Sequence, residues 1–541
     1  MVETSHWNFA DFWEMIAEAL PGAPAQRQGD RVFTWTEFDR RADGVAATLL
    51  DGRASRADRV ALCLRNSPEY LEVMFAATKI GIPAVNTNYR YRRDELLYLW
   101  RNADITAVVF HGAFTEQVGE VRGELPAVRT WIHVDDGTEA CPEWAVPYEQ
   151  AAAAAAGRTR SGWGRSGEDL FLLYTGGTTG LPKGVMWRQV DIFMQLNSVG
   201  PPSYPIEGGI PGMRRYITEP GRTHVSASPM MHGTGLFGGY LTLNDGGCVI
   251  SLRGHGFDPV ELLDTVHGLR VRSLAMVGDA FGRPILETMA REPGRWDISC
   301  LGNLLSSGAF LSDAVKAGLL EQCPSLTIVD GFSSSEGFGM GWSISTKDDV
   351  ATTARFEIGP HAAVLDDELR PVAPGSGVVG RLAVGNRVPL GYYKDEEKSA
   401  ATFVTVAGVR MALPGDRAIV EADGTIQLLG RDSLCINSAG EKIYTEEVEA
   451  VLLGHPEVAD ALVVGVPDPQ WGQAVCAVVA PVGSARPTPA ELIAHVKQRL
   501  AGYKAPKSIA VVPTVPRSPN GKADYPRARE IAGDAHRPGN G

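Results

Sequence analysis

The chain has 541 residues, a length that corresponds to roughly three or four domain-sized units with a large buried core. Hydrophobic residues make up 44% and charged residues 21%, the ordinary composition of a globular protein. The net charge of -13 argues against a broad nucleic-acid-binding surface, which needs basic patches, but it leaves room for anionic ligands held by a few local cations.

The N-terminal segment predicts an amphipathic helix rather than a signal peptide, because it lacks a basic start and carries Glu and Asp among its apolar residues. Its apolar face consists of Trp7, Phe9, Phe12, Trp13 and Ile16. No apolar run reaches membrane-spanning length. Seven cysteines are scattered without a CxxC pair, which is typical of free thiols in a reducing cytoplasm, so we expect a cytoplasmic protein.

Short apolar runs alternate with helical patterns through the next three hundred or so residues. Buried strands are predicted at 59–64, 106–112, 273–279 and 325–331, and helices at 92–102 and 312–323. Such alternation favours layered α/β structure with parallel strand pairs. The alanines of 151–167 are expected to end a helix and to pass into a surface loop, and the Pro/Gly-rich stretch 200–222 is expected to be irregular.

The pattern changes near residue 360, where β-ribbons are predicted, one of them with a turn at Asp423–Gly424. From about Ser433 a compact α/β pattern follows. We therefore predict an α/β protein with a large N-terminal domain over 1–432, made of layered α/β subdomains plus a β-rich part, and a small α+β domain over 433–541. The polar tail after Ile531 is expected to be frayed.

The stretch TGGTTGLPKG, residues 175–184, has the chemistry of a phosphate-binding loop. Glycines allow positive φ and close backbone approach, successive N–H groups can cradle an anion, and the threonines and Lys183 add donors and charge. The P-loop pattern of kinases and GTPases is not matched, because Pro182 precedes the lysine and Gly184 follows it.

The same stretch resembles the phosphate-loop signature of the adenylate-forming (AMP-binding) enzymes, which include acyl-CoA synthetases, adenylation domains of peptide synthetases and firefly luciferase. Further motifs similar to those of the family follow in order over nearly the whole chain: PMMHGTG (229–235), SSGAFLS (306–312), DGFSSSEG (330–337), PGD (414–416), LGRDS (429–433), SAGEKIYTEEVE (438–449) and PRSPNGKADY (516–525). Local details such as VPLGYYKDEEKSAATF look like an actinobacterial branch that includes fatty-acid and steroid side-chain CoA ligases.

The resemblance implies the adenylate-forming fold, in which the small C-terminal domain is mobile, and a two-step ligation with ATP, Mg²⁺ and CoA. A carboxylate attacks ATP to form an acyl-adenylate, and a thiol then displaces AMP. The carried-over catalytic residues are Lys183 on the phosphates, Glu336 on Mg²⁺, and Lys522, which reaches the active site from the C-terminal domain during adenylation.

The nucleotide-binding residues that the resemblance implies fall into three groups. The phosphate loop comprises Thr175, Gly176, Gly177, Thr178, Thr179, Gly180 and Lys183. The adenine side comprises Ser307, Gly308, Ala309, Asp330, Gly331, Phe332, Ser333, Ser334 and Ser335, with Phe332 standing where the family usually has Tyr. The ribose would be held by Asp416 and Arg431.

The acyl pocket would involve Met231, His232, Gly233 and Phe237, within a lining drawn from 225–240, 277–281, 305–310 and 331–342. Ala439, Gly440 and Lys442 would line the CoA tunnel. A hinge is implied near Asp432–Ser433, where Ser433 and Leu434 depart from the residues that many relatives carry.

Several alternatives stay open at this point. Instead of CoA, a carrier-protein thiol, an amine or nitrite is an alternative acceptor, and a chain that binds nucleotide without catalysis is a third hypothesis. The candidate acids are a medium or long acyl chain, an aromatic acid and a sterol side chain. A homodimer is a further expectation.

Overall fold

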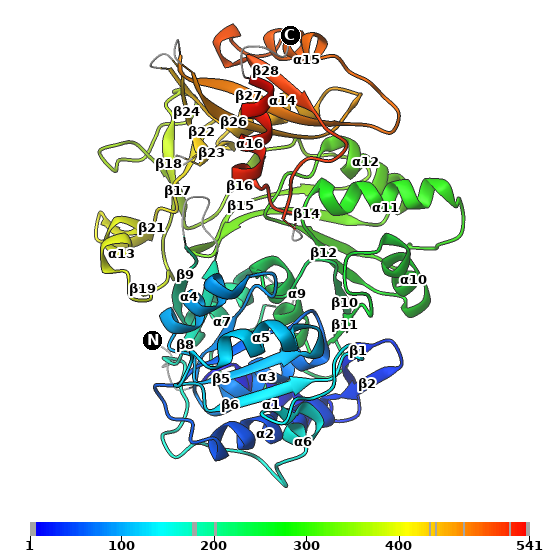
Figure 1. Cartoon of the computed structure of the whole chain (residues 1–541), viewed down its shortest axis with the longest axis vertical. Coiled ribbons are helices and arrows are strands. Elements are labelled where there is room, and N and C mark those ends of the chain that lie inside the picture. The colour runs from blue at the N-terminus through cyan, green and yellow to red at the C-terminus, as the bar shows by residue number, and fades with distance from the viewer. Residues whose placement is uncertain are drawn as a thin grey trace.

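The structure, a computed structural model, describes residues 7–175, 181–199, 203–431, 434–438, 441–468, 471–518 and 521–536. Within these ranges the strands form three sheets, two drawn from the chain before residue 432 and one from the chain after it. Figure 1 shows the N-terminal α/β layer in blue and cyan, a second layer in green and yellow, and the smaller C-terminal unit in orange and red. In the described part of the chain, no helix is both long and apolar enough to cross a membrane.

The first sheet is parallel through its centre and becomes antiparallel at the end that carries the phosphate-loop hairpin. Its order, in the described residues, is β19 (Gly391–Tyr392), β9 (Lys183–Arg188), β8 (Leu170–Thr175), β4 (Ala84–Asn86), β3 (Val60–Cys63), β5 (Ala107–His111), β6 (Thr130–Val134) and β7 (Val146–Pro147). The helices between these strands are α3 (Pro68–Lys79), α4 (Arg93–Asn102), α5 (Thr115–Arg122) and α6 (Tyr148–Ala152).

The second sheet starts with parallel strands and continues into antiparallel ribbons. In the described residues its order is β2 (Arg31–Thr34), β1 (Pro24–Gln28), β11 (Cys248–Ser251), β10 (Thr223–Ser226), β12 (Ser273–Met276), β13 (Asn303–Ser306), β14 (Thr327–Ser334), β15 (Gly337–Ser345), β16 (Arg355–Ile358), β23 (Ile426–Arg431), β22 (Asp416–Val420), β18 (Gly380–Val384), β21 (Val409–Ala412) and β20 (Phe403–Val406), with β17 (Ala362–Leu365) also on β18. The predicted parallel α/β strands and the β-ribbon with its turn at Asp423–Gly424 are therefore confirmed.

The other α-helices described before residue 432 belong to the two large layers. They are α1 (Phe9–Ala19), α2 (Trp35–Asp51), α7 (Gln189–Val199), α8 (Gly209–Arg214), α9 (Gly233–Asn244), α10 (Pro259–Leu269), α11 (Asp279–Arg291), α12 (Asp313–Gln322) and α13 (Glu396–Thr402). The short helix α8 corrects the expectation that 200–222 is irregular throughout; it begins after Gly208, whose φ of 87° gives the chain its turn into the helix.

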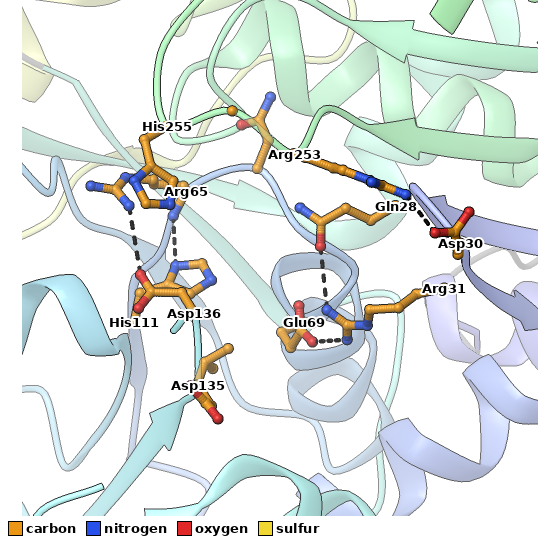
Figure 2. Close-up of a pocket in the computed structure, with 13 residues that line it drawn as sticks. Gln28, Asp30, Arg31, Arg65, Glu69, His111, Asp135, Asp136, Arg253 and His255 are labelled. Carbon is orange, nitrogen blue, oxygen red and sulfur yellow. Dashed lines mark hydrogen bonds and ion pairs between the residues drawn. The ribbon is translucent and has the colours of Figure 1, made fainter. Parts of the chain in front are cut away.

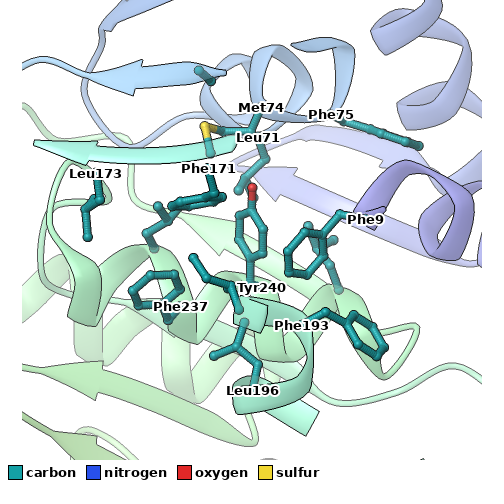
Figure 3. Close-up of a cluster of buried hydrophobic side chains, with 14 of the residues drawn as sticks. Phe9, Leu71, Met74, Phe75, Phe171, Leu173, Phe193, Leu196, Phe237 and Tyr240 are labelled. Carbon is teal, nitrogen blue, oxygen red and sulfur yellow. The ribbon is translucent and has the colours of Figure 1, made fainter. Parts of the chain in front are cut away.

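An aromatic core joins the two large sheets. Tyr240 of α9 stands at its centre, with ring centroids 4.8 Å from both Phe9 and Trp13 of α1 and 5.9 Å from Phe171 of β8. Figure 3 shows the rings of Phe9, Phe171 and Tyr240 converging from elements far apart in the sequence. Edge-to-face packing of this kind adds to the burial of apolar area, so α1 is an integral part of the core, as its apolar face predicted.

The C-terminal unit is an α+β layer. Its strands, in the described residues, run in the order β25 (Glu441–Ile443), β24 (Ile436–Ser438), β27 (Gly472–Pro481) and β26 (Val458–Asp468), with β28 (Ser508–Val511) on β27. Its helices are α14 (Thr445–Leu453), α15 (Pro489–Lys497) and α16 (Tyr525–His536). The last helix corrects the prediction of a frayed tail after Ile531, because α16 continues to His536 and buries Ala532 against the sheet.

Candidate active site

The phosphate-loop hairpin is formed by β8 and β9, which are joined by the glycine-rich residues. Thr175 ends β8 and is the cross-strand partner of Lys183, which begins β9, so the two ends of the loop are fixed opposite one another. The predicted residues Gly176, Gly177, Thr178, Thr179 and Gly180 lie outside the described residues.

Lys183 is held at the open end of this hairpin. Its Nζ lies 2.9 Å from Oδ2 of Asp395 and 5.5 Å from the ring centroid of Tyr392. The hydrogen bond from Lys183 holds the pKa of Asp395 below its usual range. The lysine is therefore oriented by this ion pair, and it remains partly exposed at the place predicted for the phosphates.

Glu336 stands in the turn between β14 and β15, beside the same tyrosine. The hydroxyl of Tyr392 donates to its Oε1 over 2.7 Å, and the Glu336 backbone N–H donates to Oγ of Ser334 over 3.2 Å. Trp187 of β9 donates to the carbonyl of Ser335 over 2.9 Å, which ties the turn to the hairpin. The predicted phosphate and metal residues thus come together in space.

Glu336 offers a cation one carboxylate, so the question is which cation such a small set of protein ligands suits. Among the described residues there is no group of three or more His, Cys, Asp or Glu that could cage a metal. Mg²⁺ keeps several waters and is usually bound by one or two carboxylates together with substrate phosphates. A single oriented carboxylate, linked through Tyr392 to the neighbourhood of Lys183, fits Mg²⁺ bound in this way.

The predicted adenine side is formed by the loop after β13 and the end of β14. Ser306 and Asp330 are partners across these parallel strands, which places Ser307, Gly308 and Ala309 beside Gly331 and Phe332. Phe332 packs at 5.8 Å from the ring of Phe356 and is half-buried. Gly308 has a φ of 95°, a conformation that favours glycine.

Two polar groups of β14 are fixed within this side. Burial raises the pKa of Asp330 to about 7, an effect opposed by Lys316 and reinforced by Asp279. The Oγ of Ser333 accepts a hydrogen bond from the backbone N–H of Gly339 over 3.1 Å. Asp330 is therefore a buried carboxyl that can serve as either a hydrogen-bond donor or an acceptor near pH 7.

The predicted ribose residues face each other on a β-ribbon. Asp416 begins β22 and is buried, and its cross-strand partner is Arg431, the last residue of β23. The side chain of Arg431 and the hinge residues Asp432 and Ser433 lie outside what the structure describes. The register alone brings the two backbone positions together.

Lys522 reaches the N-terminal part of the molecule from the C-terminal unit. A Cβ added at Gly308 would stand 3.7 Å from Cε of Lys522 and 3.8 Å from Oγ1 of Thr234. One added at Gly521 would stand 3.2 Å from the ring of Phe281. In Figure 1 the red segment before α16 descends from the C-terminal unit toward β12 and β14.

The loop that carries Lys522 is internally braced. The backbone N–H of Ser518 donates to the carbonyl of Lys522 over 2.7 Å. Arg517 donates to the carbonyl of Gly521 over 3.0 Å and to Oδ1 of Asp460 on β26 over 2.6 Å. Two of the three bonds close the loop on itself, and the third ties it to β26 of the C-terminal unit.

His232 lies at the N-terminus of α9, close to the same lysine. Burial, with Lys522 and Arg90 adding to it, lowers the pKa of His232 to about 3. The imidazole is therefore neutral at physiological pH. It stands at the start of the helix that carries the predicted acyl-pocket residues.

The other predicted acyl residues are more deeply placed. Met231 is buried, and its carbonyl accepts from Asn86 over 2.8 Å. A Cβ at Gly233 would stand 3.2 Å from the ring of Phe237. Phe237 packs edge-on against Phe338 at 4.8 Å, so it belongs to the hydrophobic core as well as to this region.

The residues predicted to contact CoA are only partly described. Ala439 and Gly440 lie outside the described residues, and so does the side chain of Lys442, whose backbone pairs with Asn437 between β24 and β25. Three residues of this region were not predicted from the sequence: Tyr392, Asp395 and Thr234. The first two stand in the stretch VPLGYYKDEEKSAATF, in which Gly391 and Tyr392 form the edge strand β19 that pairs with β9.

A cavity of about 370 Å³ lies elsewhere, at the carboxyl ends of β3, β5 and β6 and under the loop after β11 (Figure 2). Six of its charged residues form three pairs: Arg31 with Glu69, Arg65 with Asp136 and Arg253 with Asp30. Burial lowers the pKa of His111 on its wall to about 4, so this group is neutral. Of the predicted site residues that the structure describes, none lines this cavity.

Comparison with known proteins places these features in context. The model of the AMP-binding enzyme family matches residues 13–393, and that of the AMP-binding enzyme C-terminal domain matches 447–522. A medium/long-chain-fatty-acid–CoA/3-oxocholest-4-en-26-oate–CoA ligase of Mycolicibacterium smegmatis is 42% identical over 532 residues, covering 97% of this chain and 96% of the relative. A 3-oxocholest-4-en-26-oate–CoA ligase of Rhodococcus rhodochrous is 37% identical over 549 residues, with coverage of 97% and 96%.

Solved structures give the same fold. The anthranilate CoA ligase AuaEII in complex with anthranoyl-AMP superposes with a TM-score of 0.82 at 21% identity, covering 97% of each chain. This likeness confirms the expected α/β architecture of a large unit and a smaller C-terminal one.

Proposed function

The chain belongs to the AMP-binding enzyme family, and from that membership we propose that it is an ATP-dependent acid–CoA ligase that works through an acyl-adenylate. The observation that carries the assignment is the 42% identity to a CoA ligase over 97% of this chain. The structure adds that Lys522 of the C-terminal unit lies against Gly308 of the predicted adenine loop. This position would let Lys522 act in adenylation.

In the first half-reaction a carboxylate oxygen of the acid attacks the α-phosphorus of ATP, and the bond to the bridging oxygen of pyrophosphate breaks. Lys183 and the loop after Thr175 would hold the β- and γ-phosphates, and Lys522 would bridge the carboxylate and the α-phosphate. Mg²⁺ bound at Glu336 would supply positive charge to the phosphates. Catalysis of this step is positioning and electrostatic stabilisation.

The nucleoside would be held by the adenine side at β14 and by the ribose residues of β22 and β23. Phe332 would stack on adenine, with Ser307, Gly308, Ala309 and the Gly331–Ser335 segment around it. Asp330, whose pKa of about 7 lets it donate as well as accept, suits the amino edge of the base. Asp416 and Arg431 would take the ribose hydroxyls.

In the second half-reaction the CoA sulfur attacks the acyl carbon and the bond to AMP breaks, with the thiol proton passing to solvent. The loop with Ala439, Gly440 and Lys442 would serve this step after Lys522 has left the site. That exchange needs a rotation of a domain spanning 433–541 against one spanning 1–432, about a hinge at Asp432–Ser433.

The substrate that we propose is a medium- or long-chain fatty acid or a sterol side-chain acid. The names of the two bacterial relatives support this class. His232, neutral because its pKa is about 3, would border the pocket and gate it rather than act as a base, since a carboxylic acid is already ionised near pH 7.

The test is pyrophosphate release from ATP and Mg²⁺ against a panel of acids, with and without CoA. Octanoate, palmitate, 3-oxocholest-4-en-26-oate and benzoate cover the open substrate classes. We expect turnover that needs both CoA and one of the first three acids. Turnover with benzoate alone would overturn the substrate class, and acid-dependent release that ignores CoA would point to another acceptor.

A further inference from the structure

The segment from Gly391 to Asp395 lies alongside β9, the second strand of the phosphate-loop hairpin. Gly391 and Tyr392 form β19, which pairs antiparallel with Met186 and Val185 of β9. The backbone N–H of Tyr393 donates to the carbonyl of Gly184 over 2.7 Å. This edge strand is therefore held in fixed register next to Lys183.

The Tyr392 side chain is buried and contacts both charged groups of the phosphate and metal site. Its hydroxyl donates to Oε1 of Glu336 over 2.7 Å, and its ring centroid lies 5.5 Å from Nζ of Lys183. The ring also packs at 5.5 Å from Phe403, and Ser399 accepts a hydrogen bond from the Tyr392 backbone N–H. A phenol fixed on so many sides has little rotational freedom.

This arrangement has a direct consequence for Glu336. A carboxylate has two oxygens. In Glu336 one of them accepts a hydrogen bond from the phenol, which restrains the plane of the group and leaves the other oxygen for a cation. The same ring stands beside Lys183, whose ammonium pairs with Asp395 of the same segment.

We propose that Tyr392 is a positioning residue for Glu336. It orients the carboxylate so that the oxygen that does not accept from the phenol would be presented to Mg²⁺ bound together with ATP. The inference rests on the proposed function for the role of Mg²⁺. It adds a residue that the motif pattern of the chain did not single out.

The experiment compares Tyr392→Phe with Tyr393→Phe in the full-length protein. Tyr393 is the adjacent control, because its hydroxyl donates instead to Asp104 over 2.6 Å. Isothermal titration measures ATP affinity with Mg²⁺ and again with EDTA. For Tyr392→Phe we expect a loss of about tenfold to a hundredfold in affinity with Mg²⁺ and no change with EDTA, the range of a hydrogen bond to a charged group.

Three results would overturn the inference: equal affinity losses with Mg²⁺ and with EDTA, the same loss in Tyr393→Phe, or no loss in Tyr392→Phe. Thermal unfolding of both variants controls for a general structural defect. The binding arms are independent of the acid and of CoA. If they behave as expected while no acid supports pyrophosphate release, the proposed ligase function fails and the role of Tyr392 stands.

Discussion

Replacing Lys522 by Ala removes the group that joins the two units of the molecule at the site. We expect adenylation to fall by orders of magnitude while thioester formation from a supplied acyl-adenylate survives. The reason is positional: Lys522 lies against Gly308 of the adenine loop, whereas the predicted CoA residues stand on a different loop of the C-terminal unit.

The magnitude follows from the charge that is lost. One unit charge at about 4 Å from another contributes roughly 4 kcal/mol at an effective dielectric constant near 20, and about 1 kcal/mol in bulk water. Because Lys522 is exposed to solvent in this structure, we take about 2–4 kcal/mol, at or below the upper figure, for its interaction with the developing phosphate charge. At about 1.4 kcal/mol per tenfold in rate, this corresponds to a decrease of roughly 30-fold to 1,000-fold.

The assay measures each half-reaction alone. Exchange of labelled pyrophosphate into ATP reports adenylation, and conversion of synthetic acyl-adenylate plus CoA to acyl-CoA reports thioester formation. Lys497→Ala, an exposed lysine at the end of α15, is the control in the same unit. An equal fall of both half-reactions in Lys522→Ala would refute the domain-rotation account.

Three further predictions concern residues around this site and in the core. Arg517→Gln removes the ion pair with Asp460 that braces the lysine loop; we expect about tenfold slower pyrophosphate exchange with normal thioester formation, and loss of both steps would contradict it. Glu336→Gln keeps an acceptor for Tyr392 but loses its charge, so the Mg²⁺ concentration for half-maximal exchange should rise at least about tenfold; an unchanged Mg²⁺ titration would exclude a metal role. Burial lowers the pKa of His224 to about 3, so the native state binds fewer protons than the unfolded state between about pH 6.5 and 3. The free energy of unfolding therefore decreases as the pH is lowered through that window. Urea unfolding should therefore show about 2 kcal/mol more loss from pH 7 to 5 in the wild type than in His224→Gln, and parallel curves would contradict this.

Much of the fold was predictable because short-range signals specify it. Buried strands such as 325–331 are short β-branched runs, and the Asp423–Gly424 turn has the residues that its backbone conformation demands. The tail was mispredicted because the face that α16 buries beyond Tyr525 consists of Ala528 and Ala532. These small residues give no hydrophobic pattern, yet they let the helix pack closely on the sheet.

The candidate site divides in the same way. Strings such as TGGTTGLPKG have many unusual residues close together, so the positions of Lys183 and Glu336 could be predicted. The contact between Tyr392 and Glu336 spans 56 residues and depends on the register of β19 against β9. That register, which sends Tyr392 inward and Tyr393 toward Asp104, is a tertiary property with no local pattern.

The acyl side shows why pocket residues are hard to predict from motifs. Aromatic residues near a motif are equally suited to a core, and Phe237 packs against Phe338 in the hydrophobic core between the sheets. The assignment of Met231, His232, Gly233 and Phe237 to the substrate remains a prediction.

The central claim, an acid–CoA ligase that passes through an enzyme-bound adenylate, is tested most directly by a single-turnover chase. Enzyme in excess is mixed with ATP labelled at the α-phosphate, Mg²⁺ and palmitate, and CoA is added after pyrophosphate release is complete. The account predicts that labelled acyl-adenylate accumulates first and that CoA then converts it to palmitoyl-CoA and AMP. An adenylate that persists after CoA is added, or palmitoyl-CoA formed without any labelled adenylate, would contradict it.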